Sequence, residues 1–123
     1  MTPPRMTALL AATLCASSLL QPVVATAQSY PSKPVRIIVP YPPGGSVDLA
    51  GRLVAQGLQQ AMGQSFVVEN RAGGGGAIGT EVVAKAAPDG HTLLVVAPGA
   101  MTVIVHFQKV AYDPIKEFAP ITR

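Results

Sequence analysis

Short apolar runs alternate with helical repeats along the chain after residue 34. The runs at residues 35–39, 66–69 and 92–96 are rich in β-branched side chains, which is typical of buried strands. Between the first two runs, apolar residues recur at steps of three and four, which predicts an amphipathic helix that ends near Gly63. The residues of its apolar face are Val47, Ala50, Leu53, Val54, Leu58 and Ala61.

A second, shorter helix is expected after the glycine run at residues 73–76. Its apolar residues Ile78, Val82 and Ala86 share one face, and turn-forming residues end it at 88–90. Strands that alternate with helices in this way require crossover connections. The pattern therefore predicts an α/β domain with a parallel sheet in βαβαβ order.

This topology places three loops at one edge of the sheet. The loops at residues 41–46, 71–76 and 97–102 all follow the carboxyl end of a strand, where open α/β sheets bind ligands. The first two are rich in glycine and lead into helices. The first N–H groups of a helix have no partner within it and attract anions, so this edge is expected to hold a small anionic ligand.

The first loop, Tyr-Pro-Pro-Gly-Gly-Ser-Val-Asp at residues 41–48, is the strongest candidate for such a site. Gly44 and Gly45 allow a ligand to approach the backbone closely, and Ser46 is predicted to cap the helix that follows. Asp48 falls in the first helical turn, where a carboxylate suits the helix dipole. The alternative is that Asp48 accepts a hydrogen bond from a ligand or a water molecule.

The second loop allows three interpretations. Residues 74–79 satisfy the G-x-G-x-x-G spacing of a dinucleotide site, but the next strand does not end in an acidic residue that would hold a ribose. A plain flexible loop is the second interpretation. We favour the third, in which the backbone of this loop recognises a small ligand.

Charge and composition give no support to nucleic-acid binding, catalysis or metal binding. Nine Lys and Arg against six Asp and Glu give a net charge of +3, and the basic residues form no run. His91 and His106 lie far apart without neighbouring cysteines or clustered carboxylates, so we expect surface or packing roles for them. Ser46 has no His or Lys partner at a catalytic spacing. We therefore expect no enzymatic activity, cofactor or metal site.

Glu69 ends the second predicted strand, at the ligand edge. A single carboxylate in this position is expected to pair with a nearby cation, either Arg71 or Arg52.

Residues 1–27 are predicted to form a secretory signal peptide. Arg5 precedes an apolar core at residues 8–20 that is shorter than the ~18 residues of a membrane helix, and Ala25-Thr26-Ala27 has the form of a cleavage site. The mature α/β lobe would span residues 28–123 and lie in the periplasm without inserting into the membrane. It would lose Cys15, the only cysteine of the chain, and so contain no disulfide.

Five stretches of the chain resemble the solute-binding receptors of tripartite tricarboxylate transporters, also called Bug receptors. These stretches are Tyr30–Pro40, Tyr41–Asp48, Val67–Gly75, Pro88–Leu94 and Tyr112–Pro120. The resemblance implies a two-lobed periplasmic receptor that closes on a small carboxylate and delivers it to membrane permease subunits. Because it covers the N-terminal part of the first lobe only, we expect an incomplete first lobe of a type II-like periplasmic binding protein.

The resemblance also implies which residues bind the carboxylate. The implied ligand-binding residues are Tyr41, Pro43, Gly44, Gly45, Ser46 and Asp48 in the first loop, and Gly74, Gly75, Gly76 and Ala77 in the second. The alternative to a receptor is an exported α/β fragment that lacks the second lobe and has only a structural role or none.

Cleavage of the signal peptide is the prediction that this sequence pattern makes directly. Mass spectrometry of the exported protein should find an N-terminus at or near Gln28, because the cleavage site ends at Ala27. Recovery of uncleaved chain from the membrane fraction would contradict the prediction.

Overall fold

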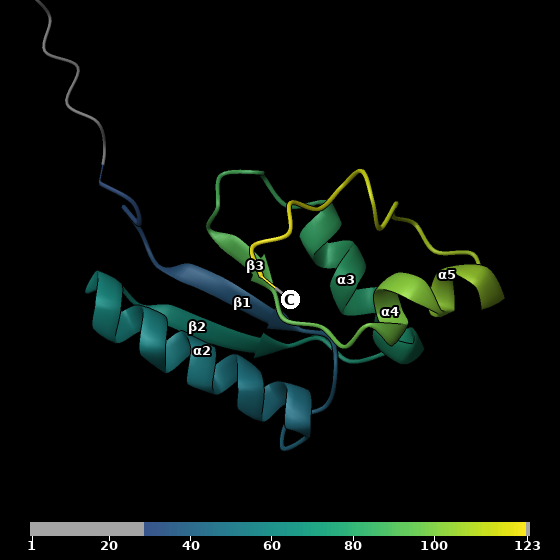
Figure 1. Cartoon of the computed structure of the whole chain (residues 1–123), viewed down its shortest axis with the longest axis horizontal. Helices are drawn as coiled ribbons and strands as arrows, with labels where there is room; N and C mark the ends of the chain where they lie inside the picture. Colours follow the sequence, from purple (N-terminus) through teal and green to yellow (C-terminus); the bar gives the residue numbers. More distant parts are fainter. Residues whose placement is uncertain (1–28, 123) are drawn as a thin grey trace, which may run out of the picture.

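The computed structural model describes residues 29–122, so the predicted signal peptide lies outside the described residues. Its three strands form one parallel sheet in the order β2-β1-β3 (Figure 1). The strands are β1 (Val35–Val39), β2 (Phe66–Asn70) and β3 (Thr92–Leu94). The predicted α/β class and parallel sheet are confirmed, although β3 ends two residues before the predicted boundary.

Helices connect the strands and follow the last of them. α2 (Ser46–Met62) joins β1 to β2, while the 3-10 turn η2 (Gly74–Gly76) leads into α3 (Ala77–Ala84), which joins β2 to β3. Two short helices, α4 (Gly99–Thr102) and α5 (Ile104–Phe107), come after β3. In the described part of the chain, no helix has the length and apolar character needed to cross a membrane.

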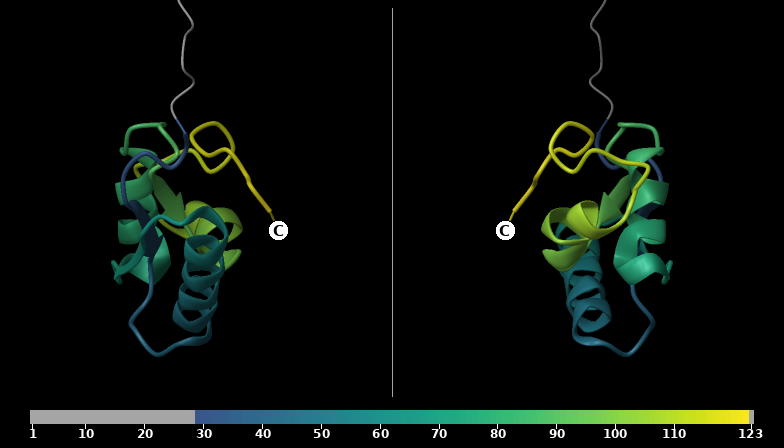
Figure 2. Two further views of the ribbon diagram at one scale, coloured as in Figure 1. Left: turned by 90° about the vertical axis from the view of Figure 1, so that its left-hand side faces the viewer. Right: turned by 90° about the vertical axis from the view of Figure 1, so that its right-hand side faces the viewer.

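α2 and α3 cover opposite faces of the sheet (Figure 1 and Figure 2). The central strand β1 is buried on both faces, with Ile37 and Ile38 fully inaccessible to solvent, which explains its apolar sequence. α2 leaves β1 toward one face and α3 leaves β2 toward the other, and the strand order β2-β1-β3 places the topological switch point between the carboxyl ends of β1 and β3. The loops that follow the three strands therefore lie together at this edge of the sheet.

α2 approaches the sheet through small side chains. A Cβ atom on Gly51 would lie only 2.8 Å from Cγ2 of Val39, so a larger residue would push the helix away from β1. Ala55, one turn later, is buried in the same core. This close approach fixes the start of α2 beside the carboxyl end of β1.

The predicted apolar face of α2 is only partly correct. Val47 and Leu58 pack against the core, but Leu53 and Val54 are 60% and 45% exposed. Leu49 adds to the same exposed surface. The prediction failed at these positions because Gly51 and Ala55 make the contact with the sheet. Such small residues do not stand out in a pattern of large apolar side chains.

α3 repeats this arrangement on the other face. A Cβ atom on Gly79 would lie 2.7 Å from both the carbonyl oxygen of Arg71 and Cβ of Pro40, so glycine is required there as well. Thr80 is buried beside it, whereas Ile78 is 54% exposed. The predicted face of α3 was therefore wrong at Ile78, and the helix ends before Ala86.

The exposed face of α2 makes a prediction about stability. Replacing Leu53 with Gln should change the free energy of unfolding by no more than about 0.5 kcal/mol, because the side chain is largely in solvent. Ile37→Val is the comparison, and it should cost about 0.5–1.5 kcal/mol because it removes a buried methyl group. Urea unfolding followed by circular dichroism measures both changes. A loss above about 2 kcal/mol for Leu53→Gln would mean that this face is covered.

Candidate functional site

Asn70 ties the first loop to the sheet. It is the last residue of β2, and its Nδ2 donates to the carbonyl oxygen of Tyr41 at 3.1 Å and to Oδ1 of Asp48 at 2.9 Å. One amide side chain thus holds both the loop and the first turn of α2. Asn70 is not among the predicted site residues, and its position at the end of a strand on the ligand edge is the only signal for it in the sequence.

Asp48 holds the first loop in place by accepting a hydrogen bond from its backbone. Its carboxylate is buried, and Oδ2 accepts hydrogen bonds from Arg52 Nε at 3.0 Å and from the N–H of Gly44 at 2.9 Å. Hydrogen bonds from Arg52, Gly44 and Asn70 lower the pKa of Asp48 to about 2. Both carboxylate oxygens are therefore occupied by protein donors, and a direct contact of Asp48 with a ligand stays a prediction.

The start of α2 offers unused hydrogen-bond donors. The N-cap is Gly45, and no side chain caps the helix, so the predicted cap by Ser46 is wrong. Ser46 instead occupies the first helical position. Leu49 is the first helical residue whose N–H donates within the chain, to the carbonyl oxygen of Gly45. Among the described residues, the N–H groups of Ser46, Val47 and Asp48 have no acceptor, which makes this helix end attractive to an anion.

An open hollow of about 320 Å³ lies at this helix end. It combines apolar rings with the backbone of the first helical turn, and its lining residues are Tyr41, Pro42, Pro43, Gly45, Ser46 and Val47. Four of the six predicted residues of the first loop are among them. Gly44 and Asp48 are not, and their bond to each other shapes the loop behind the hollow.

The second loop forms a hydrogen-bonded turn. Its four glycines, at 73–76, all have positive φ angles, from 56° to 137°, which side-chain-bearing residues rarely adopt. The N–H of Gly76 donates to Gly73, and that of Ala77 donates to Gly74. Of the four predicted donors in this loop, only Gly74 and Gly75 have N–H groups without an acceptor among the described residues.

The three loops meet at Gly76. A Cβ atom on this residue would lie 3.1 Å from the hydroxyl oxygen of Tyr41 in the first loop. It would also lie 3.0 Å from Cβ of Ala100 in α4, which forms within the third predicted loop at residues 97–102. The absence of a side chain at Gly76 therefore allows all three loops to come into contact.

The arginines near this edge are paired with carboxylates. Arg52 binds Asp48, while Arg36 and Arg71 bind Glu69 at 2.8 and 3.1 Å. The predicted Glu69–Arg71 pair is confirmed, and the alternative with Arg52 is wrong.

Arg36, the principal partner of Glu69, was not predicted from the sequence. Arg36 donates two hydrogen bonds to this carboxylate from the neighbouring strand. The hydrogen bonds from Arg36 and then Arg71 lower the pKa of Glu69 to about 2. Because these arginines are paired with carboxylates, an anion at this edge would be attracted mainly by backbone dipoles.

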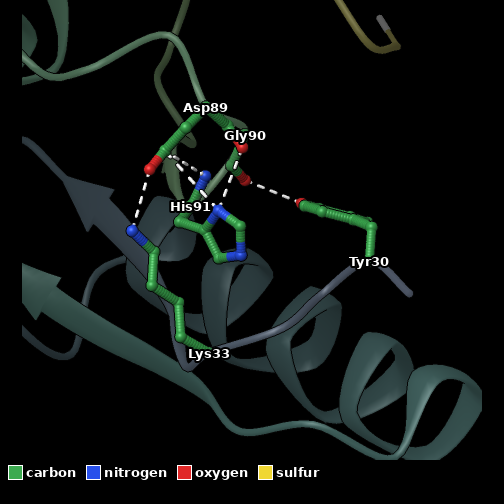
Figure 3. Close-up of polar contacts among 5 residues, drawn as sticks. All are labelled: Tyr30, Lys33, Asp89, Gly90 and His91. Atoms are coloured by element: carbon green, nitrogen blue, oxygen red, sulfur yellow. Dashed lines mark hydrogen bonds and ion pairs between the residues drawn. The ribbon is translucent and has the colours of Figure 1, made fainter. Parts of the chain in front are cut away.

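A polar cluster closes the opposite end of the sheet (Figure 3). The hydroxyl of Tyr30 donates to the carbonyl oxygen of Gly90 at 2.7 Å, and Lys33 pairs with Asp89 at 2.9 Å. His91 packs edge-on against the Tyr30 ring, which confirms its predicted packing role. Among residues 29–122, no group of His, Cys, Asp and Glu is arranged to hold a metal ion.

Known proteins match most of this chain. A family model described as tripartite tricarboxylate transporter family receptor matches residues 50–123. Protein BugT of Bordetella pertussis is 41% identical over 99 residues, which cover 79% of this chain and 30% of BugT. Because the match covers 79% of this chain, it includes both glycine-rich loops, at residues 41–46 and 71–76. The chain spans 28–30% of the length of the first three curated relatives that it matches.

Two solved structures with bound ligands are similar in fold. MatC from Rhodopseudomonas palustris, with bound malate, has a TM-score of 0.71 and 40% identity over 75% of this chain and 32% of its own. Rpa4515 of R. palustris, with adipate, has a TM-score of 0.63 and 36% identity over 70% of this chain and 29% of its own. Both ligands are dicarboxylates.

The buried Asp48 predicts how stability depends on pH. Because its pKa is lowered from 3.8 to about 2 in the folded protein, Asp48 stabilises the fold above pH 4, and this contribution is lost as the pH falls toward 2. Asp48→Asn should therefore make the urea midpoint less dependent on pH between 4 and 2. Glu81→Gln, which removes a surface ion pair with Lys85, is the control. Equal acid sensitivity of Asp48→Asn and the unmodified protein would exclude this role.

Proposed function

The chain belongs to the family of tripartite tricarboxylate transporter receptors, and on this premise we propose that it binds a small carboxylate at the carboxyl edge of its sheet. The proposal includes delivery of the solute to the membrane permease subunits of such a transporter, from the periplasm. Relatives described as a periplasmic transporter and as periplasmic binding protein BugD support this location.

The uncapped start of α2, which opens into the hollow, is the observation that carries the proposal. Ser46, Val47 and Asp48 present three N–H groups with no acceptor among the described residues. A carboxylate has two oxygens that accept such donors, and hydrogen bonds to an ionised acceptor are stronger than neutral ones. The hollow, at about 320 Å³, also matches the lower size range of small-molecule sites.

The neutralised arginines favour recognition by backbone groups. Arg52 and Arg71 both lie near the loops, but Asp48 and Glu69 already pair with them. A carboxylate that bound either arginine would compete with these protein carboxylates. We therefore propose that the ligand binds the helix end and the backbone of the second loop, where Gly74 and Gly75 add two N–H groups.

The same site supports binding rather than catalysis. A serine nucleophile needs a neighbouring base, and the hydroxyl of Ser46 makes no hydrogen bond with any described residue. The hollow is also open to solvent. Three water-exposed hydrogen bonds of about 0.5–1.5 kcal/mol each contribute about 1.5–4.5 kcal/mol together, so binding should be no tighter than roughly millimolar, which corresponds to about 4 kcal/mol.

Blocking the hollow at Gly45 tests the proposal. Gly45 has an extended backbone with φ of −81°, and a Cβ atom there would have only one neighbour, at 3.8 Å, so Gly45→Val should fold normally. Its side chain would occupy the entrance that the ligand needs. We expect malate and adipate to bind at least tenfold more weakly, measured by NMR titration.

Gly57→Val is the matched control, because Gly57 lies on the exposed side of α2 with no atom near its missing side chain. This variant should keep the affinity of the unmodified protein. Equal binding by Gly45→Val and Gly57→Val would refute the assignment of this site.

A further inference from the structure

The phenol of Tyr112 connects the end of the described chain to the ligand edge. Tyr112 is only 7% exposed, and its hydroxyl donates to the carbonyl oxygen of Ala100 in α4 at 2.6 Å. Its ring stands edge-on against Phe118, with 6.0 Å between the ring centroids. Ring packing and the hydrogen bond together fix α4 against the segment that carries Tyr112.

Ala100 connects α4 to the second loop. It is fully buried, and its Cβ lies 3.0 Å from the point where a side chain of Gly76 would begin. Any movement of α4 toward or away from the sheet therefore changes the space around Gly76. Because Gly76 has a φ of 102° and no side chain, its position depends on these neighbours.

Thr80 forms a second connection to the second loop, from α3. Its buried hydroxyl donates to the carbonyl oxygen of Gly76 at 2.8 Å. Gly76 is thus held by α3 through Thr80 and by α4 through Ala100.

We propose that Tyr112 is a positioning residue for the ligand site: its hydroxyl holds Ala100 against Gly76 and so keeps the second loop beside Tyr41. The proposal rests on the proposed function for its effect on binding. Loss of the hydroxyl would leave the buried carbonyl of Ala100 without this donor, which favours displacement of α4. The second loop would then lose its fixed distance from the first.

Tyr30 provides a control for the loss of a tyrosine hydroxyl. Its hydroxyl also donates to a backbone carbonyl, that of Gly90, at 2.7 Å, but at the opposite end of the sheet (Figure 3). Tyr112→Phe and Tyr30→Phe therefore remove the same kind of bond. Tyr30 is 49% exposed and Tyr112 only 7%, so the two variants are expected to lose different amounts of global stability. A positioning role therefore also requires that Tyr112→Phe speeds up exchange more at the Gly76 amide than at the amides of α2 in the same protein.

The experiment compares amide hydrogen exchange and malate binding in the full chain. We expect the Gly76 amide, which donates to Gly73, to exchange at least fivefold faster in Tyr112→Phe than in Tyr30→Phe. We also expect Tyr112→Phe alone to bind malate five- to tenfold more weakly. Equal exchange of the Gly76 amide in the two variants would overturn the proposal.

The experiment also remains informative if the protein binds neither dicarboxylate or if Tyr112→Phe does not fold. If the unmodified protein binds neither malate nor adipate, the proposed function fails, but the exchange comparison still decides whether Tyr112 positions the loop. If Tyr112→Phe does not fold, Phe118→Leu replaces it, because that variant loosens the ring and keeps the hydroxyl. Faster exchange of the Gly76 amide would then support the proposal, and unchanged exchange would refute it.

Discussion

The close approach of two helices to the central strand is the constraint on which this structure depends. Gly51 brings α2 within contact of Val39, and Gly79 brings α3 within contact of Pro40 on the other face. A methyl group at either glycine would have to displace a neighbour or the helix. Since both contacts lie toward the carboxyl end of β1, they also determine where the first and second loops meet.

Polar side chains then fix the loops on this scaffold. Asp48 and Asn70 bind each other, and through Gly44 and Tyr41 they hold the first loop at two backbone positions. The second loop is fixed differently, by its own backbone bonds and by the hydroxyl of Thr80. The first loop therefore depends on a buried charge, whereas the second depends on the conformational freedom of glycine.

The charged side chains near the two loops are paired with one another. The carboxylates of Asp48 and Glu69 neutralise the nearby arginines, and their lowered pKa values reflect those bonds. What remains for an anion is a set of N–H groups at the start of α2, next to apolar rings. Such a site would select a ligand by the fit of its carboxylate to fixed donors, since backbone N–H groups cannot move as long cationic side chains do.

The sequence alone determined the strands, their order along the chain and the loops that follow them, because these follow from local periodicity and turn chemistry. Tertiary structure decided which helix faces are buried, since Gly51 and Gly79 make the contacts while Leu53 remains exposed. It also decided that Glu69 binds Arg36, because parallel register brings these side chains from neighbouring strands together. Pairings between residues distant in the chain depend on register and approach distance, and no local pattern encodes either.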